Sequence, residues 1–283
     1  MSDSGTFSAD WLALRTAADD RARSHELMDA AATFLATQGG HAQGEQDSQR
    51  GPTHICDLGA GTGATLRALA PHLPPPQSWT LVDRDARLLA EAKRLFAQNP
   101  ITGVTLTTAQ RNLSDSGPPW ASTPDLLTAS ALFDLTGAEI INRLARACAA
   151  GGVALFSMLT FDGVLELYPH HPSDGLMREA FNTHQKTDKG LGPAAGPDAP
   201  ETLASAFGAH GYEVISADTP WELLASRDGE MIEAMLTGWA GAALELGHLP
   251  PATIETWLDA RRGTTDRLIV GHRDQLFLPP SRA

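Results

Sequence analysis

The sequence predicts an α/β fold: a mostly parallel seven-stranded sheet with helices on both faces, an N-terminal helical segment and an inserted lid after strand five. From residue 53 onward, short apolar segments alternate with amphipathic ones, which is typical of βαβ units and a parallel sheet. The chain has 283 residues, 42% of them hydrophobic, enough for one such domain with additions. We therefore expect N-terminal helices and a linker over residues 1–52 and the main domain over 53–283.

The N-terminal segment carries two helical patterns. Ser8 is placed to cap the first, and the second begins at about Ser24. Residues 38–52 are polar and aperiodic, which predicts a surface linker. The apolar positions at helical spacing are Trp11, Leu12, Leu14, Leu27, Met28, Ala31, Phe34 and Leu35.

Five strands and their helices are expected next. Helices are predicted through Leu66, over 85–98 and through Leu144, the last ended by Gly151-Gly152. The predicted strands are residues 54–58, 79–82, 104–108, 125–130 and 153–160.

The alternation breaks at residue 161. Residues 161–200 are rich in Pro, His, Asp and Gly, and a loop of this length in a compact domain is usually functional, so we expect an insertion. A helix through Phe207 and a strand over 212–217 resume the pattern, followed by a helical insert over 229–261. Apolar residues at 268–270 and 276–278 are available for a closing strand.

A glycine loop follows the first predicted strand, in the segment Asp57-Leu58-Gly59-Ala60-Gly61-Thr62-Gly63. Glycines let a ligand approach the backbone closely, and the helix that follows offers free N–H groups. The spacing also fits the dinucleotide fingerprint, which places an acidic residue about 20 positions on. Asp83, at the end of the second strand, suits that position, where its carboxylate accepts from ribose hydroxyls.

Asp57 distinguishes between a dinucleotide and a cationic ligand at this loop. Its carboxylate would repel a pyrophosphate, whereas it would attract a ligand with an ammonium group and a sulfonium. Here the sequence resembles the class I S-adenosylmethionine-dependent methyltransferases, whose first motif has the form acidic-x-Gly-x-Gly-x-Gly. The resemblance covers about residues 53–159 and implies S-adenosylmethionine as cofactor and S-adenosylhomocysteine as product.

The resemblance also implies roles for individual residues. The loop would surround the methionine part of the cofactor, with Asp57 near its amino group and Asp83 on the ribose. Arg15 is a candidate for the cofactor carboxylate, the alternative being a solvated helix charge. The remaining expected cofactor contacts are Gly59, Ala60, Gly61, Thr62, Gly63, Arg84, Asn112, Leu113, Ser130 and Ala131.

The methyl acceptor is expected beyond strands four and five. Asp134 either contacts the acceptor or caps the next helix. In the insertion, His184 and Asp188 have i, i+4 spacing, so a helix would let the Asp orient a His general base. This spacing also suits two metal ligands, but no third ligand follows and we expect no metal. The other acceptor-site candidates are Tyr168, His170 and His171.

The composition of the chain limits the class of methyl acceptor that we expect. The formal charge is −13, and no Lys/Arg cluster with interleaved aromatics offsets it, so we expect a small molecule and not a nucleic acid. The alternatives are an RNA or protein methyltransferase, an NAD-dependent oxidoreductase and a non-catalytic binding module. There is no signal-peptide pattern or membrane-length apolar run, and the two cysteines suit buried thiols, so we expect a cytoplasmic protein.

Overall fold

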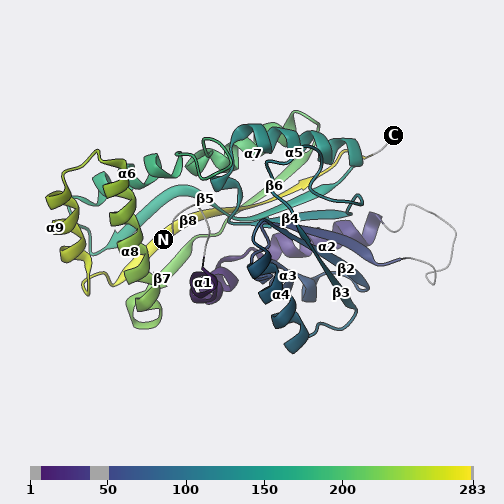
Figure 1. Ribbon diagram of the computed structural model, residues 1–283, viewed down its shortest axis with the longest axis horizontal. Coiled ribbons are helices and arrows are strands. Elements are labelled where there is room, and N and C mark those ends of the chain that lie inside the picture. Colours follow the sequence, from purple (N-terminus) through teal and green to yellow (C-terminus); the bar gives the residue numbers. More distant parts are fainter. Residues whose placement is uncertain (1–7, 39–50, 282–283) are drawn as a thin grey trace.

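The computed structural model describes residues 8–38 and 51–281, so the predictions for residues 1–7 and for residues 39–50 of the linker lie outside the described residues. One mixed sheet organises the chain (Figure 1). Its strands are β1 (Thr53–Leu58), β2 (Gln77–Asp83), β3 (Val104–Gln110), β4 (Leu126–Ser130), β5 (Ala154–Tyr168), β6 (Glu213–Asp218), β7 (Trp221–Leu224) and β8 (Arg267–Leu278). The helices are α1 (Ala9–Ala22), α2 (His25–Gln38), α3 (Ala64–Leu69), α4 (Ala86–Gln98), α5 (Ala138–Gly151), α6 (Asp174–Gln185), α7 (Ala199–Gly208), α8 (Ala225–Leu246) and α9 (Pro251–Arg261).

The strand order is β3-β2-β1-β4-β5-β8-β6, with β7 also paired to β8. Strands β1 to β5 pair in parallel, and β8 runs antiparallel to β5, β6 and β7. The predicted mostly parallel α/β fold is confirmed. The sheet has eight strands where seven were expected, because the short β7 adds to the seven.

Helices cover both faces of the parallel part of the sheet. Alternation along β1 sends Ile55 into a core with α2, α3 and α4, and Cys56 and Leu58 into a core with α5 and α7. Both cores are mostly apolar, as burial on two faces requires, although the sheet also buries polar side chains such as Gln77, Thr128 and Ser157. Cys56 and Cys148 are buried free thiols, as predicted.

A second lobe grows from two strands that continue beyond the parallel sheet (left in Figure 1). Residues 161–200, which were expected to form an insertion, are more regular than the sequence indicated. Strand β5 runs on to Tyr168, paired with the first half of β8, and α6 follows. Apolar residues of β5, β7, β8, α6, α8 and α9 pack there into a core of their own, which α1 joins through Ala18. The lobe therefore has its own hydrophobic support.

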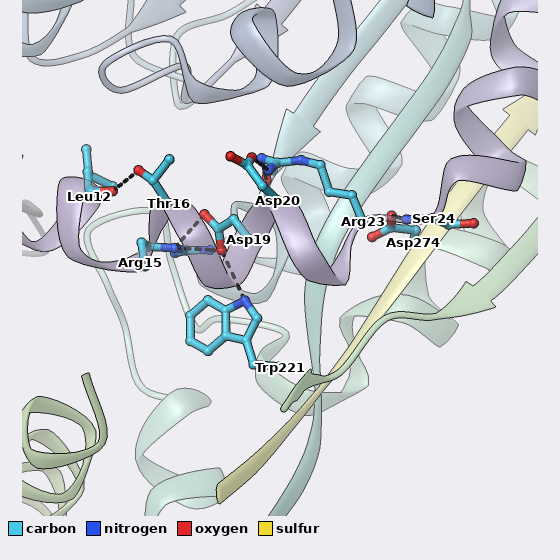
Figure 2. A network of polar contacts seen from close by, with 10 residues as sticks. Leu12, Arg15, Thr16, Asp19, Asp20, Arg23, Ser24, Trp221 and Asp274 are labelled. Atoms are coloured by element: carbon cyan, nitrogen blue, oxygen red, sulfur yellow. Dashed lines mark hydrogen bonds and ion pairs between the residues drawn. The ribbon is translucent and has the colours of Figure 1, made fainter. Parts of the chain in front are cut away.

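Helix α1 lies between this lobe and the parallel sheet. It begins as predicted, with Ser8 accepting a hydrogen bond from the Trp11 N–H (3.1 Å). At its other end, the Ser24 N–H donates to Asp274 of β8 (3.0 Å), which ties the helix to the sheet (Figure 2). Among the described helices, none has the length and apolarity needed to cross a membrane.

Candidate cofactor and acceptor site

The glycine loop joins β1 to α3 in a conformation that requires glycine. Gly59, Gly61 and Gly63 have φ values of +59°, +53° and +78°. A Cβ on Gly59 would lie 2.8 Å from Cδ1 of Leu132, and one on Gly61 would lie 3.1 Å from Cδ1 of Leu12. The loop is therefore held between the segment that follows β4 and the covering helix α1.

Asp83 lies directly against this loop. Its Oδ2 accepts the Gly61 N–H at 2.9 Å, and its Oδ1 accepts the Asp85 N–H at 2.9 Å. The ends of β1 and β2 are adjacent in the parallel sheet, which brings the predicted loop and its predicted acidic partner together. Carboxylate oxygens have lone pairs beyond these two bonds, so Asp83 keeps the capacity to accept from a ligand hydroxyl.

Asp57 ends β1 inside the protein, with 0% of its surface exposed. Thr128 of β4 donates to its Oδ1 at 2.7 Å, while Oδ2 is buried without a hydrogen-bond partner among the described residues. Burial raises the pKa of Asp57 to about 7, although the Thr128 hydroxyl and the positive charge of Arg23 oppose that rise. Such a group is stabilised in its ionised form by a cationic ligand.

Arg23 was not among the sequence candidates. It sits between α1 and α2 with its side chain 1% exposed, paired with Asp20 at 3.0 Å. Its Nη2 lies 3.4 Å from Oγ of Ser130, and its Nε is buried without a partner among the described residues. Its charge also lowers the pKa of Asp57, so the guanidinium lies beside the carboxyl ends of β1 and β4.

Arg15, the arginine that the sequence favoured, has other partners. Its guanidinium makes a bidentate pair with Asp19 (2.9–3.1 Å) and lies 4.8 Å from the ring centre of Trp221 (Figure 2). Trp221 also contacts the same carboxylate, donating from Nε1 to Asp19 at 3.1 Å. At 8% exposure Arg15 is not a solvated helix charge, so that alternative is wrong. Of the two arginines, the structure places Arg23 against Ser130.

The residues predicted to lie near the adenine differ in their surroundings. Asn112 Oδ1 accepts from the Ser114 N–H at 3.1 Å, so the amide oxygen expected to face the adenine is engaged in a local turn. Leu113 packs at the edge of the core that contains α5. The guanidinium of Arg84 approaches Gly190, whose Cβ would lie 3.4 Å from it. Residues of the insertion therefore reach this side of the site.

The segment after β4 combines strain with a buried acid. Ala131 has a φ of +50°, which is uncommon for a residue with a side chain and clusters at functional sites. Asp134 is 7% exposed, and its Oδ1 has no partner among the described residues. Burial raises its pKa to about 6, while Arg15 acts in the opposite direction. The residue at the N-cap of α5 is Gly137, so the alternative of Asp134 as a helix cap is wrong.

The expected pair of His184 and Asp188 does not form. Helix α6 ends at Gln185, so Asp188 lies outside it and accepts from the Gly190 N–H at 2.7 Å. His184 instead contacts Glu245 of α8, with 2.9 Å between Nε2 and Oε2. The spacing argument was wrong because it assumed a helix one turn longer than the one that forms.

Tyr168, His170 and His171 lie at the far end of β5. Tyr168 is ten residues beyond Met158, the partner of Ser130, which corresponds to roughly 30 Å along a strand at about 3.3 Å per residue. There the Tyr168 hydroxyl donates to Glu166 at 2.8 Å and its ring packs on His170 at 4.7 Å. The structure does not bring these predicted acceptor residues to the glycine loop.

Strand β8 instead brings polar residues to the site that sequence reasoning missed. His272 is 5% exposed and pairs opposite Phe161 of β5, and its ring packs at a tilt against Trp221 with 4.5 Å between ring centres. Burial and then the charge of Arg15 lower its pKa to about 3. Asp274, fully buried, accepts from the Leu159 N–H (2.7 Å) and from Ser24. A signal was present: polar residues interrupt an apolar strand at positions where a sheet interior needs partners.

Comparison with known proteins is consistent with this geometry. Residues 56–154 match the family model described as a methyltransferase domain. A cyclopropane synthase of Mycobacterium tuberculosis, MmaA2, has a similar fold, with a TM-score of 0.51, 12% identity and coverage of 96% of this chain and 94% of that one. The magnesium protoporphyrin IX methyltransferase of Synechocystis PCC 6803, solved with bound SAH, gives a TM-score of 0.44 and 14% identity over 77% of this chain and 83% of that one.

One curated sequence relative adds a local similarity. The non-reducing polyketide synthase sorB of Penicillium rubens is 43% identical over 54 residues, which is 18% of this chain. The chain spans only 2% of the length of that relative. Together, these comparisons show a match to a methyltransferase domain over residues 56–154 and a Rossmann-like α/β fold similar to that of MmaA2.

Proposed function

We propose that the chain binds S-adenosylmethionine at the glycine loop and transfers its methyl group to a small-molecule acceptor. One observation carries the proposal: Asp57 and Asp83 flank a loop whose three glycines have positive φ, and Arg23 lies at the neighbouring end of β4, against Ser130. These charges complement the ammonium, ribose and carboxylate of that cofactor. When bound, S-adenosylmethionine supplies a methyl group on a positively charged sulfur, an electrophile that needs alignment more than activation.

The residues fit this cofactor atom by atom. The buried Oδ2 of Asp57 lacks a partner and would face the ammonium group, directly or through water. The buried Nε of Arg23 also lacks a partner, and its guanidinium would hold the carboxylate beside Ser130. Asp83 would accept from the ribose hydroxyls. In this assignment Arg23 takes the role that the sequence had suggested for Arg15.

The proposal of a small-molecule acceptor is based on the net charge of the chain. The formal charge of −13 disfavours a polyphosphate substrate, and no specific observation favours RNA or protein. We also propose a cytoplasmic location, because the two buried free thiols, Cys56 and Cys148, suit its reducing conditions.

Thermal unfolding with S-adenosylhomocysteine, NAD and NADP in parallel tests the cofactor. A ligand at 100 times its Kd should stabilise by about 2.7 kcal/mol, and we expect this for S-adenosylhomocysteine alone. Asp83→Ala should abolish the shift. The matched control is Asp85→Ala, which removes the neighbouring carboxylate but keeps the backbone N–H that Asp83 accepts. Stabilisation by NAD alone, or an unchanged shift in Asp83→Ala, would contradict the proposal.

A further inference from the structure

Asp274 of β8 joins three segments of the chain that lie far apart in the sequence. It has 0% of its surface exposed, and both of its carboxylate oxygens accept hydrogen bonds. Oδ1 accepts from the Leu159 N–H at 2.7 Å and from the Thr219 hydroxyl at 3.0 Å. Oδ2 accepts from the Ser24 N–H at 3.0 Å (Figure 2). A carboxylate is costly to bury unless such bonds compensate it, so the three donors and Asp274 stabilise one another.

Strand β5 has a β-bulge opposite Asp274. The register of β5 against β8 shifts there, so that Met158 and Leu159 lie opposite Asp274 alone. Leu159 has a φ of +52°, which is uncommon for a residue with a side chain and needs support from its surroundings. The carbonyl of Met158 accepts the Ala131 N–H at 2.9 Å. The bulge that Asp274 stabilises is therefore bonded to the segment that follows β4.

The end of β4 lies beside the glycine loop. Strands β1 and β4 pair in parallel as far as Leu58 and Ala129, so Gly59 and Ser130 follow side by side. A Cβ on Gly59 would lie 2.8 Å from Cδ1 of Leu132, so the segment after β4 contacts the loop directly. This segment forms one wall of the proposed cofactor site.

The turn between α1 and α2 carries Arg23 to the same wall. Ser24 follows Arg23 directly, so its bond to Asp274 fixes the backbone from which the guanidinium extends. The Arg23 side chain is 1% exposed, and its Nη2 lies 3.4 Å from Oγ of Ser130. Its Nε is buried without a partner among the described residues. Asp274 thus holds both the turn with Arg23 and the strand end that Arg23 faces.

We propose that Asp274 is a positioning residue for cofactor binding. It holds the turn that carries Arg23 against the end of β4, and this places the guanidinium to receive the carboxylate of S-adenosylmethionine. The inference rests on the proposed function. Because Asp274 acts through Arg23, loss of its bond to the turn should weaken recognition of the cofactor carboxylate and leave recognition of the adenosine part intact.

Two substitutions at Ser24 remove or keep the bond to Asp274. Ser24→Pro removes the N–H and directs the proline ring at Oδ2 of Asp274. Arg23 has a ψ of 139°, which suits a residue before proline, so the turn itself tolerates this change. Ser24→Ala keeps the N–H, and both variants lose the hydroxyl that accepts from the Leu27 N–H at 3.3 Å. The two variants therefore differ in the bond under test.

Two ligands that differ in the carboxylate provide the measurement. S-adenosylhomocysteine and its decarboxylated analogue, S-adenosyl-3-thiopropylamine, share the adenosine, the sulfur and the amino group. In calorimetric titrations, Ser24→Pro should bind S-adenosylhomocysteine at least about tenfold more weakly than Ser24→Ala, with the affinities for the analogue within about threefold. Equal weakening of both ligands, or no weakening of either, would overturn the proposal. A wild-type chain that binds neither ligand would instead contradict the proposed function.

A double-mutant cycle tests whether Asp274 acts through Arg23. An Asn amide has one acceptor oxygen where the carboxylate has two, so Asp274→Asn cannot satisfy both backbone donors. It should weaken S-adenosylhomocysteine binding at least about tenfold, and its combination with Arg23→Met should bind within about threefold of Arg23→Met alone. The exposed control Asp259→Asn should bind as the wild type does. Full additivity of the Asp274 and Arg23 losses would overturn the positioning role, and if Asp274→Asn does not fold, the Ser24 pair decides.

Discussion

Replacing Asp57 with Asn should stabilise the protein at alkaline pH while weakening cofactor binding. Asp57 is fully buried, and its pKa rises from 3.8 to about 7. A raised pKa in the folded state means that folding binds a proton. The contribution of Asp57 to stability is therefore fully present below pH 3.8 and is lost as the pH rises through about 7.

The size of the effect follows from the shift. About three pKa units at 1.36 kcal/mol each give a loss of at most about 4 kcal/mol at pH 8, and at pH 5 the loss is only about 1.7 kcal/mol. The Asn side chain does not ionise and still accepts from Thr128. Relative to wild type, Asp57→Asn should therefore gain about 2.5 kcal/mol between pH 5 and pH 8.

Urea unfolding at pH 5 and pH 8 measures this gain. The control is Asp259→Asn on the exposed surface of α9, which should show the same difference from wild type at both pH values. In the same variants, calorimetric titration with S-adenosylhomocysteine should show at least tenfold weaker binding for Asp57→Asn alone. A stability difference that does not change between pH 5 and pH 8 would refute the assigned burial of an ionisable Asp57.

Two further predictions address the loop and the second lobe. Gly59→Ala should destabilise by about 1–3 kcal/mol and weaken S-adenosylhomocysteine binding, because it combines a φ of +59° with a 2.8 Å contact to Leu132. Gly247→Ala, with a φ of +68° and no atom within 4 Å, is the control; equal effects on binding would contradict the packing argument. Arg261→Met should lower the free energy of unfolding by about 3–5 kcal/mol, because the Arg261 side chain is 2% exposed and paired with Asp174 of α6. The same variant should bind S-adenosylhomocysteine normally. Weakened binding would show that the second lobe supports the loop.

Short-range signals correctly predicted that the glycine loop and Asp83 lie together. Asp57, the glycines and Asp83 lie within one βαβ unit, and parallel pairing of β1 with β2 sets the ends of these strands side by side. The Gly61 N–H consequently meets the Asp83 carboxylate. The mostly parallel α/β fold followed from the alternation of strands and helices along the sequence, and it is confirmed.

Long-range packing set the rest of the site. Arg23 and His272 reach it because β8 returns to the sheet near the end of the chain, and Ser24 binds Asp274 across 250 positions. No local pattern reports such a contact. The continuous strand β8 was also missed, because the partners of its polar residues lie in the turn between α1 and α2, on β5 and in the segment after β6.

The prediction of a His184–Asp188 pair in the insertion was wrong for a different reason. Helical spacing placed Asp188 one turn beyond His184, but periodicity does not report where a helix ends. The end of α6 at Gln185 left His184 to pair with Glu245 of α8. The other acceptor candidates were chosen for their chemistry alone, and the extension of β5 carries them away from the loop.

A crystal structure of the chain with S-adenosylhomocysteine tests the proposed cofactor site. We expect the ribose hydroxyls on Asp83, the amino group near Asp57 and the carboxylate on Arg23 beside Ser130. Density for the ligand away from the glycine loop, or a carboxylate held by Arg15 with Arg23 unengaged, would contradict it.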